Sequence, residues 1–486
     1  MKKILCIILS LLMILPMSVT AFAETGEAYD ESECSQLPIV FVRGMDFPNL
    51  KINPDSDDSE NAIKFDFKTV APFVSKAVLN LIKGDKDSAL ENVIDCSYEI
   101  FKYNSMDENG DPLYNTGMVK YPESAENYPF FYDEYDFENG LTHTLIESMP
   151  AKHVYYIHYD WRLDPLTVAD EINDTVNRAI EATGHEKVKI ICSSMGGIMT
   201  MGYLTKYGYD KVERCLFMSS TFCGTQIASD MFTGKIKFTP ETLYNFCYNA
   251  VSDSFILSRI VKSLYKSGLF NSLMKVTDYI VDNYKDEVYE RVFIPVFSHM
   301  PVFWGLIQPE DYEDAVDYIL GGRTDENAEF LKRTDALRDM MKNRNELLDK
   351  MISDGVKIAV VSHYNQPLAP VYESADFNGD TVLETRQTSG YATAAKYGET
   401  LGDDYVPENE KYLSPDRVID LSTAILPEYT YIIKNAPHVA CSYGTEYSEF
   451  AMYLLTTDGD LKPGTNERYP QFMLSDKNKE TLKSFD

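Results

Sequence analysis

Short apolar runs recur along the chain, separated by longer segments in which apolar residues return every three or four positions. The short runs are almost continuously apolar and rich in Val, Ile, Phe and Tyr, which is typical of strands in a parallel sheet buried on both faces. Strands that alternate with helices predict an α/β sheet with crossover connections. The predicted strands cover residues 37–42, 153–158, 188–192, 212–218, 356–361 and 429–433, and the predicted core helices cover 167–182, 196–207 and 445–455.

Two long segments interrupt this alternation. Residues 48–151 follow the first predicted strand and combine acidic loops with one helical piece at 74–82. Residues 227–354 separate two strands, and their pattern predicts several amphipathic helices, which we interpret as a cap over the sheet. The predicted core is therefore discontinuous: residues 24–226, which contain the first insertion, and residues 355–486 flank the helical cap. The helices predicted within the cap are 241–250, 254–262, 272–284 and 328–351.

The first 23 residues have the features of a secretory signal peptide. Two lysines precede an apolar stretch at 4–19, and Ala21-Phe22-Ala23 then provides the pattern that signal peptidase recognises. We expect cleavage after Ala23 and a secreted, extracytoplasmic protein. An uncleaved anchor is the alternative, because the stretch is almost long enough to span a bilayer. After cleavage we expect no stable membrane insertion, since no other segment combines the required length with an absence of charge.

Charge and cysteine usage narrow the range of partners. The chain has 76 acidic and 45 basic residues, and its formal net charge is −31. Such a surface repels nucleic-acid phosphates and anionic membranes at long range, so nucleic-acid binding is not expected. Seven cysteines follow the signal segment without a Cys-x-x-Cys pair, so no zinc or dithiol redox site is predicted. The Asp-x-Asn-x-Asp runs at 107–111 and 376–380 lack the glutamate that closes a calcium loop, and we expect neither a metal nor an organic cofactor.

The segment 190–197 carries the strongest chemical signal. A buried strand runs into Ser193-Ser194 and then directly into a helix. A serine on such a turn exposes its hydroxyl above the sheet, and the backbone N–H of Met195 then lies at a helix N-terminus, where it can stabilise negative charge. The consensus of this nucleophile elbow is Gly-x-Ser-x-Gly, and Cys192 occupies the first glycine position. We predict Ser194 as the nucleophile, with Ser193 as the rival, in an α/β-hydrolase fold with a mostly parallel sheet and a large helical cap insertion.

A histidine after the nucleophile should act as its base, because this fold orders its catalytic triad as Ser, acid, His. Three histidines follow Ser194. His299 lies in the predicted cap, and His363 ends a strand that should precede the acid. His438 lies between the last predicted strand and the last predicted helix, where the base belongs, and it is therefore the predicted base.

The acid should follow the predicted strand at 356–361. Two aspartates lie downstream of that strand, and a carboxylate in this loop would orient the imidazole and stabilise the imidazolium. We select Asp380, on the resemblance described below, and Gly379 beside it permits the sharp loop that a buried carboxylate needs. Asp376 is the alternative.

The end of the first predicted strand supplies a second oxyanion donor. This donor is expected to be a backbone N–H just after the strand, which ends Val42-Arg43-Gly44-Met45. Gly44 permits a tight turn, and the N–H of Met45 is then the donor, opposite that of Met195. Arg43 is expected to form a salt bridge within the turn.

The most apolar segment after the signal peptide is 292–306, inside the predicted cap. Its aromatic residues are candidates for the wall of an acyl-binding pocket, and we select Phe297 and Trp304 as substrate-binding candidates. The alternative, at least equal in weight, is that these side chains only pack the cap onto the sheet.

A further motif is specific enough to indicate a family. Tyr159-Asp160-Trp161-Arg162-Leu163 resembles the Tyr-Asp-Trp-Arg motif of the lecithin–cholesterol acyltransferase and lysosomal phospholipase A2 family. Gly379-Asp380-Thr381-Val382 and the late histidine are similar to that family's acid loop and base, although one residue is missing between Asp380 and Thr381. The resemblance makes Trp161 a third substrate-binding candidate, while Asp160 and Arg162 are expected to fix the loop. The similar segments are residues 37–45, 153–225 and 356–455.

These observations together predict a secreted serine esterase or lipase, with phospholipase activity among its options. Its substrate would be a small-molecule or lipid ester, cleaved through an acyl-enzyme on Ser194. Two alternatives stay open. One is an acyltransferase with the same mechanism, and the other is a catalytically silent binding protein on the same fold.

Overall fold

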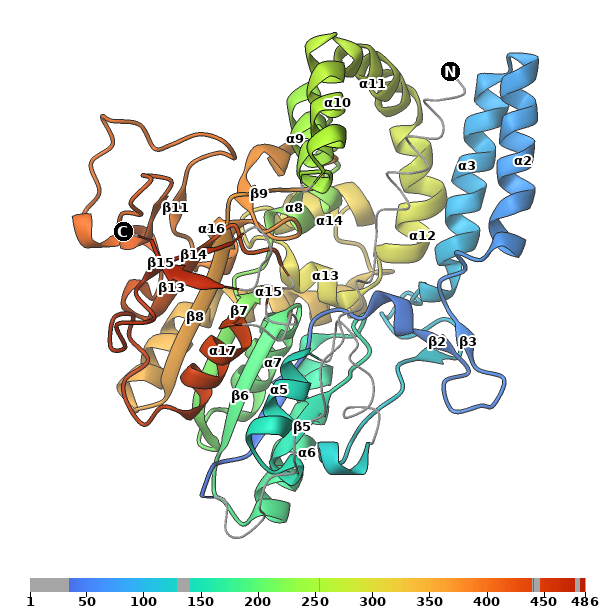
Figure 1. Ribbon diagram of the computed structural model, residues 1–486. Helices are drawn as coiled ribbons and strands as arrows, with labels where there is room; N and C mark the ends of the chain where they lie inside the picture. The colour runs from blue at the N-terminus through green and yellow to red at the C-terminus, as the bar shows by residue number, and fades with distance from the viewer. Residues whose placement is uncertain are drawn as a thin grey trace.

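A mostly parallel sheet of eight strands forms the centre of the molecule (Figure 1). The computed structural model describes residues 35–128, 140–252, 254–438, 440, 446–476 and 481–485, and the predicted signal peptide lies outside them. The strand order is β15-β14-β13-β8-β7-β6-β1-β5, and neighbours are parallel except for the antiparallel pair β14 and β15. The strands are β1 (Ile39–Val42), β5 (Val154–Ile157), β6 (Val188–Ser194), β7 (Val212–Ser220), β8 (Lys357–Tyr364), β13 (Thr430–Lys434), β14 (Phe472–Ser475) and β15 (Leu482–Ser484).

Helices cover both faces of this sheet. In β1, the side chains of Val40 and Val42 point to one face of the sheet and belong to the apolar cluster there, whereas those of Ile39 and Phe41 belong to the cluster on the opposite face. Each cluster includes side chains from the group of helices that covers its face. All four side chains are buried, which explains why the apolar pattern of this strand is continuous. The first group is α6 (Pro165–Thr183), α7 (Gly196–Tyr207) and α15 (Ala328–Ser353), and the second is α5 (Gly140–Ser148) and α17 (Glu446–Thr456).

The path of the chain through the sheet creates a switch point at β1. From β1 the chain runs outward to the edge strand β5, returns to β6 on the other side of β1, and then adds β7, β8 and β13 in order. In open parallel sheets the connections diverge at such a point and leave a crevice outside the carboxyl ends of the strands. This sheet order, with its crossover helices, is the α/β-hydrolase fold that the sequence predicts.

The excursion after β1 contains a small sheet and a helical hairpin. The sheet pairs β2 (Lys51–Ile52) with β3 (Glu60–Asn61) and β4 (Thr116–Gly117). The hairpin consists of α2 (Phe67–Lys83) and α3 (Lys86–Phe101), where the sequence pattern predicts a single helical piece at 74–82. Gly84, with φ of +85°, ends α2, and the side chain of Asp85 caps α3 by accepting from the Ser88 N–H.

The long segment between β7 and β8 is helical, as predicted, but its last helix does not belong to the cap. That helix, α15, packs against α7 and β8 and so covers a face of the sheet, while also contacting α13 (Pro301–Leu306) of the cap. No helix in the described ranges is long and apolar enough to cross a bilayer. The remaining helices of the segment are α8 (Gln226–Phe232), α9 (Pro240–Ala250), α10 (Phe255–Lys266), α11 (Leu269–Val288), α12 (Ile294–Phe297), α13 (Pro301–Leu306) and α14 (Tyr312–Leu320).

The segment between β8 and β13 forms short antiparallel pairs beside the sheet. These are β9 (Gln366–Pro367) with β10 (Asn378–Gly379) and β11 (Thr393–Ala394) with β12 (Ile419–Asp420), and α16 (Thr385–Thr388) lies between the pairs in sequence. The pair β9–β10 directly precedes Asp380 and therefore fixes the position of that carboxylate.

Candidate active site

Ser194 lies on a sharp turn between β6 and α7. It is the last residue of β6, its φ is +49°, and α7 begins two residues later at Gly196. A left-handed backbone at a residue with a side chain costs roughly 1–2 kcal/mol, so the surrounding packing must enforce this turn. Gly196 permits it, because a Cβ at that position would lie 2.1 Å from the carbonyl oxygen of Val42 in β1.

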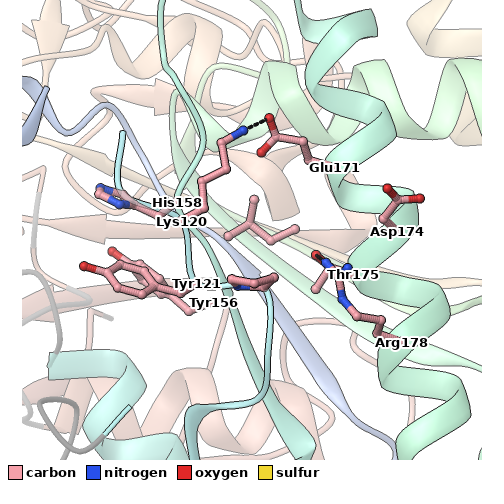
Figure 2. A pocket seen from close by; sticks show the side chains of 10 residues that line it. Lys120, Tyr121, Tyr156, His158, Glu171, Asp174, Thr175 and Arg178 are labelled. Carbon is pink, nitrogen blue, oxygen red and sulfur yellow. Dashed lines mark hydrogen bonds and ion pairs between the residues drawn. The ribbon is translucent and has the colours of Figure 1, made fainter. Parts of the chain in front are cut away.

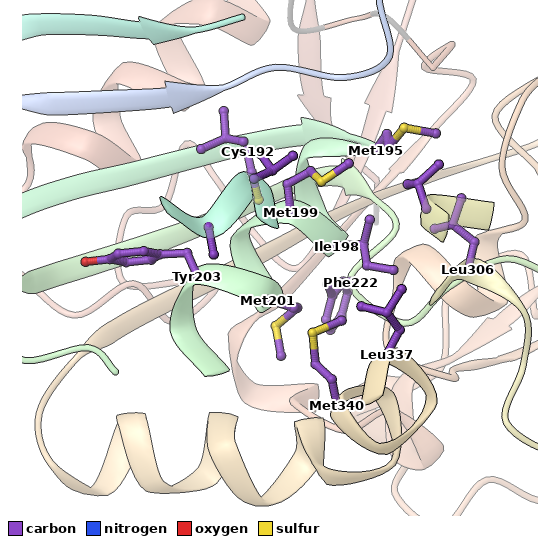
Figure 3. Close-up of a cluster of buried hydrophobic side chains, with 14 of the residues drawn as sticks. Cys192, Met195, Ile198, Met199, Met201, Tyr203, Phe222, Leu306, Leu337 and Met340 are labelled. Carbon is purple, nitrogen blue, oxygen red and sulfur yellow. The ribbon is translucent and has the colours of Figure 1, made fainter. Parts of the chain in front are cut away.

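Cys192, at the first glycine position of the motif, is accommodated by the core. Its side chain is buried, and its thiol lies 3.4 Å from the carbonyl oxygen of Leu216 in β7. Figure 3 shows Cys192 among the apolar side chains beneath the turn, with Met195 and Ile198 of the elbow nearby. The departure from glycine therefore fills core volume below the turn.

His438 follows β13 and contacts Ser194. Its Nε2 lies 2.8 Å from the Ser194 Oγ. Its Nδ1 lies 2.8 Å from Oδ2 of Asp380, and its backbone N–H also donates to the Asp380 carbonyl oxygen at 2.8 Å. With Nδ1–H donated to a carboxylate, Nε2 keeps the lone pair that can accept the serine proton.

His363, another histidine after Ser194, does not contact the serine. It lies near the end of β8, is buried, and its Nε2 bonds to the hydroxyl of Tyr447. Burial lowers the pKa of His363 to about 4, so its ring is neutral over the usual working range.

The Asp380 carboxylate is buried and accepts several hydrogen bonds. Its carboxylate accepts from the N–H groups of Val382 at 3.0 Å and Leu383 at 2.7 Å, and from the hydroxyl of Ser219. Burial alone would raise the pKa of Asp380, but the charge and hydrogen bond of His438 outweigh it and lower the pKa to about 2. The carboxylate therefore stays ionised at neutral pH and can stabilise an imidazolium.

The sequence leaves a choice between two aspartates for the acid of the triad, and the structure places them in different surroundings. Asp376 is at the surface and pairs with Lys396 at 2.5 Å. It is Asp380, not Asp376, that bonds to His438. Similarly, the serine within hydrogen-bond distance of His438 is Ser194, one residue beyond Ser193.

The loop after β1 is held by buried charges. Arg43 forms the expected salt bridge within the turn, with its Nη1 2.7 Å from Oδ2 of Asp46, and the Tyr159 hydroxyl donates to the Arg43 carbonyl oxygen at 2.9 Å. Nε2 of His158 lies 2.8 Å from the same Asp46 oxygen, and its Nδ1 lies 2.6 Å from the carbonyl oxygen of Val119. Burial would raise the pKa of Asp46, but His158 and Arg43 together lower it below its ordinary value.

Asp46 and His158 are site residues that the sequence reasoning did not identify. They are 112 positions apart, and only the parallel pairing of β1 with β5 brings them together. They fix the loop that contains Met45. Within the described ranges of the chain, the N–H groups of Met45 and Met195 have no hydrogen-bond partner, so both remain available as donors.

The Tyr-Asp-Trp-Arg segment has the structural role expected for its charged pair. Nη2 of Arg162 lies 2.6 Å from Oδ2 of Asp160, and the same guanidinium donates to Thr116 and to the carbonyl oxygen of Asn104. Arg162 thereby joins the excursion after β1 to the core. Trp161 packs against Phe47 with ring centroids 5.4 Å apart.

The aromatic substrate-binding candidates pack in the interior. Trp161 and Trp304 are fully buried, and the indole N–H of Trp304 donates to the Ser298 carbonyl oxygen at 2.6 Å. Neither indole offers accessible surface to a ligand in this structure, and for Trp304 the packing alternative fits better. Phe297 is partly buried and its ring packs at an angle against those of Phe101 and Phe303, which joins the cap to the excursion.

A separate cavity of about 120 Å³ lies beside β5 and α6 (Figure 2). Its lining includes His158, Lys120 and Arg178, and Lys120 bonds to Glu171 across it. Ser194 does not contribute to this lining. The cavity is connected to the candidate site through His158 and its contact with Asp46.

Comparisons with known proteins add little to this geometry. No protein-family model matches the chain, and no curated protein matches it. Among solved structures, it is similar to a chain in the crystal structure of the Tle4–Tli4 complex, with 9% sequence identity and a TM-score of 0.32, over 68% of this chain and 75% of that chain. The family that the motifs resemble stays a prediction, and the sheet order and connections of the molecule itself establish the α/β-hydrolase fold.

Proposed function

We propose that this chain is a serine hydrolase of carboxylic esters, an esterase or lipase that forms an acyl-enzyme on Ser194. The observation that carries the proposal is the pair of 2.8 Å hydrogen bonds that join Ser194 to His438 and His438 to Asp380. Serine hydroxyls are weak nucleophiles, and a base that is itself oriented by a buried carboxylate is the arrangement that activates them.

The reaction has two halves. In the first, Nε2 of His438 takes the proton of Ser194 while Oγ attacks the ester carbonyl carbon, and the N–H groups of Met45 and Met195 donate to the oxyanion. The tetrahedral adduct collapses, the bond to the alcohol oxygen breaks, and His438 protonates that oxygen. In the second half His438 deprotonates a water molecule, which attacks the acyl carbon, releases the carboxylic acid and restores the serine.

Acyl transfer uses the same groups, with an alcohol replacing water in the second half. The two reactions differ only in the acceptor, so product analysis with and without added alcohol distinguishes them. The apolar N-terminal segment supports export, and we accordingly propose an extracytoplasmic site of action.

Labelling with a fluorophosphonate tests the proposal. We expect the purified wild-type chain to react covalently and to hydrolyse short-chain p-nitrophenyl esters. Ser194→Ala should lose both properties while its thermal unfolding stays close to wild type, and Ser193→Ala is the matched control that should keep both. A folded wild-type protein that neither labels nor hydrolyses esters would indicate a silent binding protein.

A further inference from the structure

Two helices expose apolar side chains on the outside of the molecule. α2 packs on α3, and α10 packs against α9 and α11, so each is an outer helix of its group. The α2–α3 hairpin and the helices α9, α10 and α11 lie on the same side of the sheet (Figure 1). α10 has no buried residue along its twelve positions, and α2 buries only Ala77.

The exposed apolar residues of α10 form a stripe along the helix. Ile256, Ile260 and Leu264 follow one another at intervals of four residues, and all three are exposed, Ile256 by 69%. Four-residue spacing places them on one helix face. Such a stripe normally packs on a core, but in α10 the core contacts are made by Val261 and Tyr265.

α2 carries a shorter cluster of exposed apolar residues. Val78, Leu79 and Ile82 are exposed near its C-terminal end, and Phe67 at its start is 87% exposed. Contiguous exposed apolar surface on a soluble domain indicates an interaction site.

The charges of these two helices are opposite to those of the whole chain. Their charged residues are all basic, and neither helix contains Asp or Glu, although the chain carries a net charge of −31. In α10 the guanidinium of Arg259 lies 4.2 Å from the centroid of the Phe255 ring, which places a cation directly beside the exposed apolar surface. The basic residues are Lys68, Lys76 and Lys83 in α2 and Arg259, Lys262 and Lys266 in α10.

We propose that α2 and α10 form a docking surface for an anionic lipid membrane. A helix with an apolar stripe and Lys or Arg beside it lies in a membrane interface, where the stripe enters the acyl boundary and the cations meet lipid phosphates. The net negative charge of the chain does not prevent this, because charges farther away than about 8 Å are largely screened at physiological salt. A second copy of the chain fits less well, since pairing two α10 stripes would bring like charges together.

This docking surface is independent of the proposed hydrolase activity, but it would complement it. The excursion that carries α2 follows the end of β1, and the segment that carries α10 follows the end of β7, so both surfaces arise at the carboxyl edge where Ser194 lies. A molecule docked through these helices presents that edge to the membrane.

Vesicle co-sedimentation of the full chain tests the proposal. We expect binding to vesicles of phosphatidylcholine mixed with phosphatidylglycerol, and at least tenfold weaker binding to vesicles of phosphatidylcholine alone. The triple variant R259Q/K262Q/K266Q should bind the mixed vesicles about 100-fold more weakly, since each basic side chain near an anionic surface contributes roughly fivefold in affinity. The triple variant I256S/I260S/L264S should also bind at least tenfold more weakly. K332Q/K342Q/K350Q, which removes three exposed lysines of α15, is the matched control and should bind like wild type.

Several outcomes would overturn the proposal. Equal binding to both kinds of vesicle, or loss of binding in the α15 control, would show that the basic residues of α2 and α10 are not responsible for binding to anionic vesicles. Absence of vesicle binding together with a dimer that I256S/I260S/L264S dissociates would identify α10 as a self-association face. Hydrolysis of a soluble short-chain ester, measured in parallel, separates the two proposals: docking can fail while ester hydrolysis persists, and hydrolysis can be absent while docking persists.

Discussion

Gly44 and Ser194 lie so close together that a methyl group on Gly44 would be 2.6 Å from the Ser194 Cβ and 3.1 Å from its Oγ. The loop after β1 and the elbow after β6 therefore approach each other to a distance that only glycine permits. This contact brings the Met45 N–H and the serine to the same place, and it makes the absence of a side chain at position 44 a requirement of the site.

We predict that Gly44→Ala lowers kcat about 100-fold, because a displacement of reacting groups by about 1 Å has an effect of that size. The fluorophosphonate labelling rate should fall with it. Gly117→Ala is the control, since a Cβ there meets its nearest neighbour at an ordinary 3.6 Å. A Gly44→Ala variant with wild-type kcat would show that the loop after β1 does not take part in the reaction.

Asp380→Asn should lower kcat by about 10⁴-fold, because the amide favours the wrong imidazole tautomer and cannot stabilise the imidazolium. Asp376→Asn should have almost no effect, since it removes only a surface pair with Lys396, worth less than about 1 kcal/mol. Steady-state kinetics on a soluble ester measures both. Equal losses in the two variants would contradict the assignment.

The pKa of Asp380 also predicts a dependence of stability on pH. Because the pKa is lowered to about 2 in the folded protein, the folded state binds fewer protons than the unfolded state between that pH and the ordinary value near 4. The stability contributed by Asp380 is then complete above about pH 4 and is lost as the pH falls toward 2. Urea unfolding at pH 5 and pH 3 should show a smaller loss of stability on acidification in Asp380→Asn than in wild type.

Glu384 should make the stability of the fold depend on pH in the direction opposite to that of Asp380. It is fully buried and accepts from the Ile227 N–H and the Thr225 hydroxyl, both at 2.8 Å, and burial raises its pKa to about 7. The folded state therefore holds a proton that the unfolded state releases at lower pH, and stability falls as the pH rises from about 4.5 to 7. In Glu384→Gln this loss, at most about 3 kcal/mol, should disappear from denaturant unfolding at pH 5 and 8, whereas exposed Glu373→Gln should retain it.

His158 is predicted to position the loop after β1. Its two ring nitrogens lie within hydrogen-bond distance of the Val119 carbonyl oxygen and the Asp46 carboxylate, so the ring ties together two segments beside this loop. His158→Ala should lower kcat by about 10- to 100-fold, less than loss of an oxyanion donor itself can cost, with little change in KM. His185→Ala, at the opposite end of the sheet, is the control. A rise in KM with unchanged kcat would instead indicate a role in substrate binding.

The features of this molecule that the sequence predicts are those determined by local patterns. A buried strand followed by Ser194 and a helix specifies the elbow without any knowledge of distant residues, and the order of strands selects His438 over His363. The segment of α3 carries acidic residues along its length, which weakens its apolar pattern, and the second helix of the hairpin was not predicted. The pair β14 and β15 was missed because the two strands are only four and three residues long, too short to show a period.

Other features depend on tertiary packing that no local pattern encodes. Trp161 and Trp304 are aromatic whether they line a pocket or fill a core, so their burial could not be predicted. The period of α15 is that of a helix in either layer, and only its contacts with α7 and β8 show which layer it joins. The pairing of Asp46 with His158 required the register of β1 against β5.

The separation of Ser194 from His438 has a consequence for the lifetime of the chain before it is complete. The two residues are 244 positions apart, and His438 reaches the serine only after β13, which ends at Lys434, has paired with β8. Until then the elbow can fold around a serine that lacks its base. On the proposed mechanism, a nascent or truncated molecule without β13 therefore has the elbow but lacks the base, and the topology delays reactivity until β13 is in place.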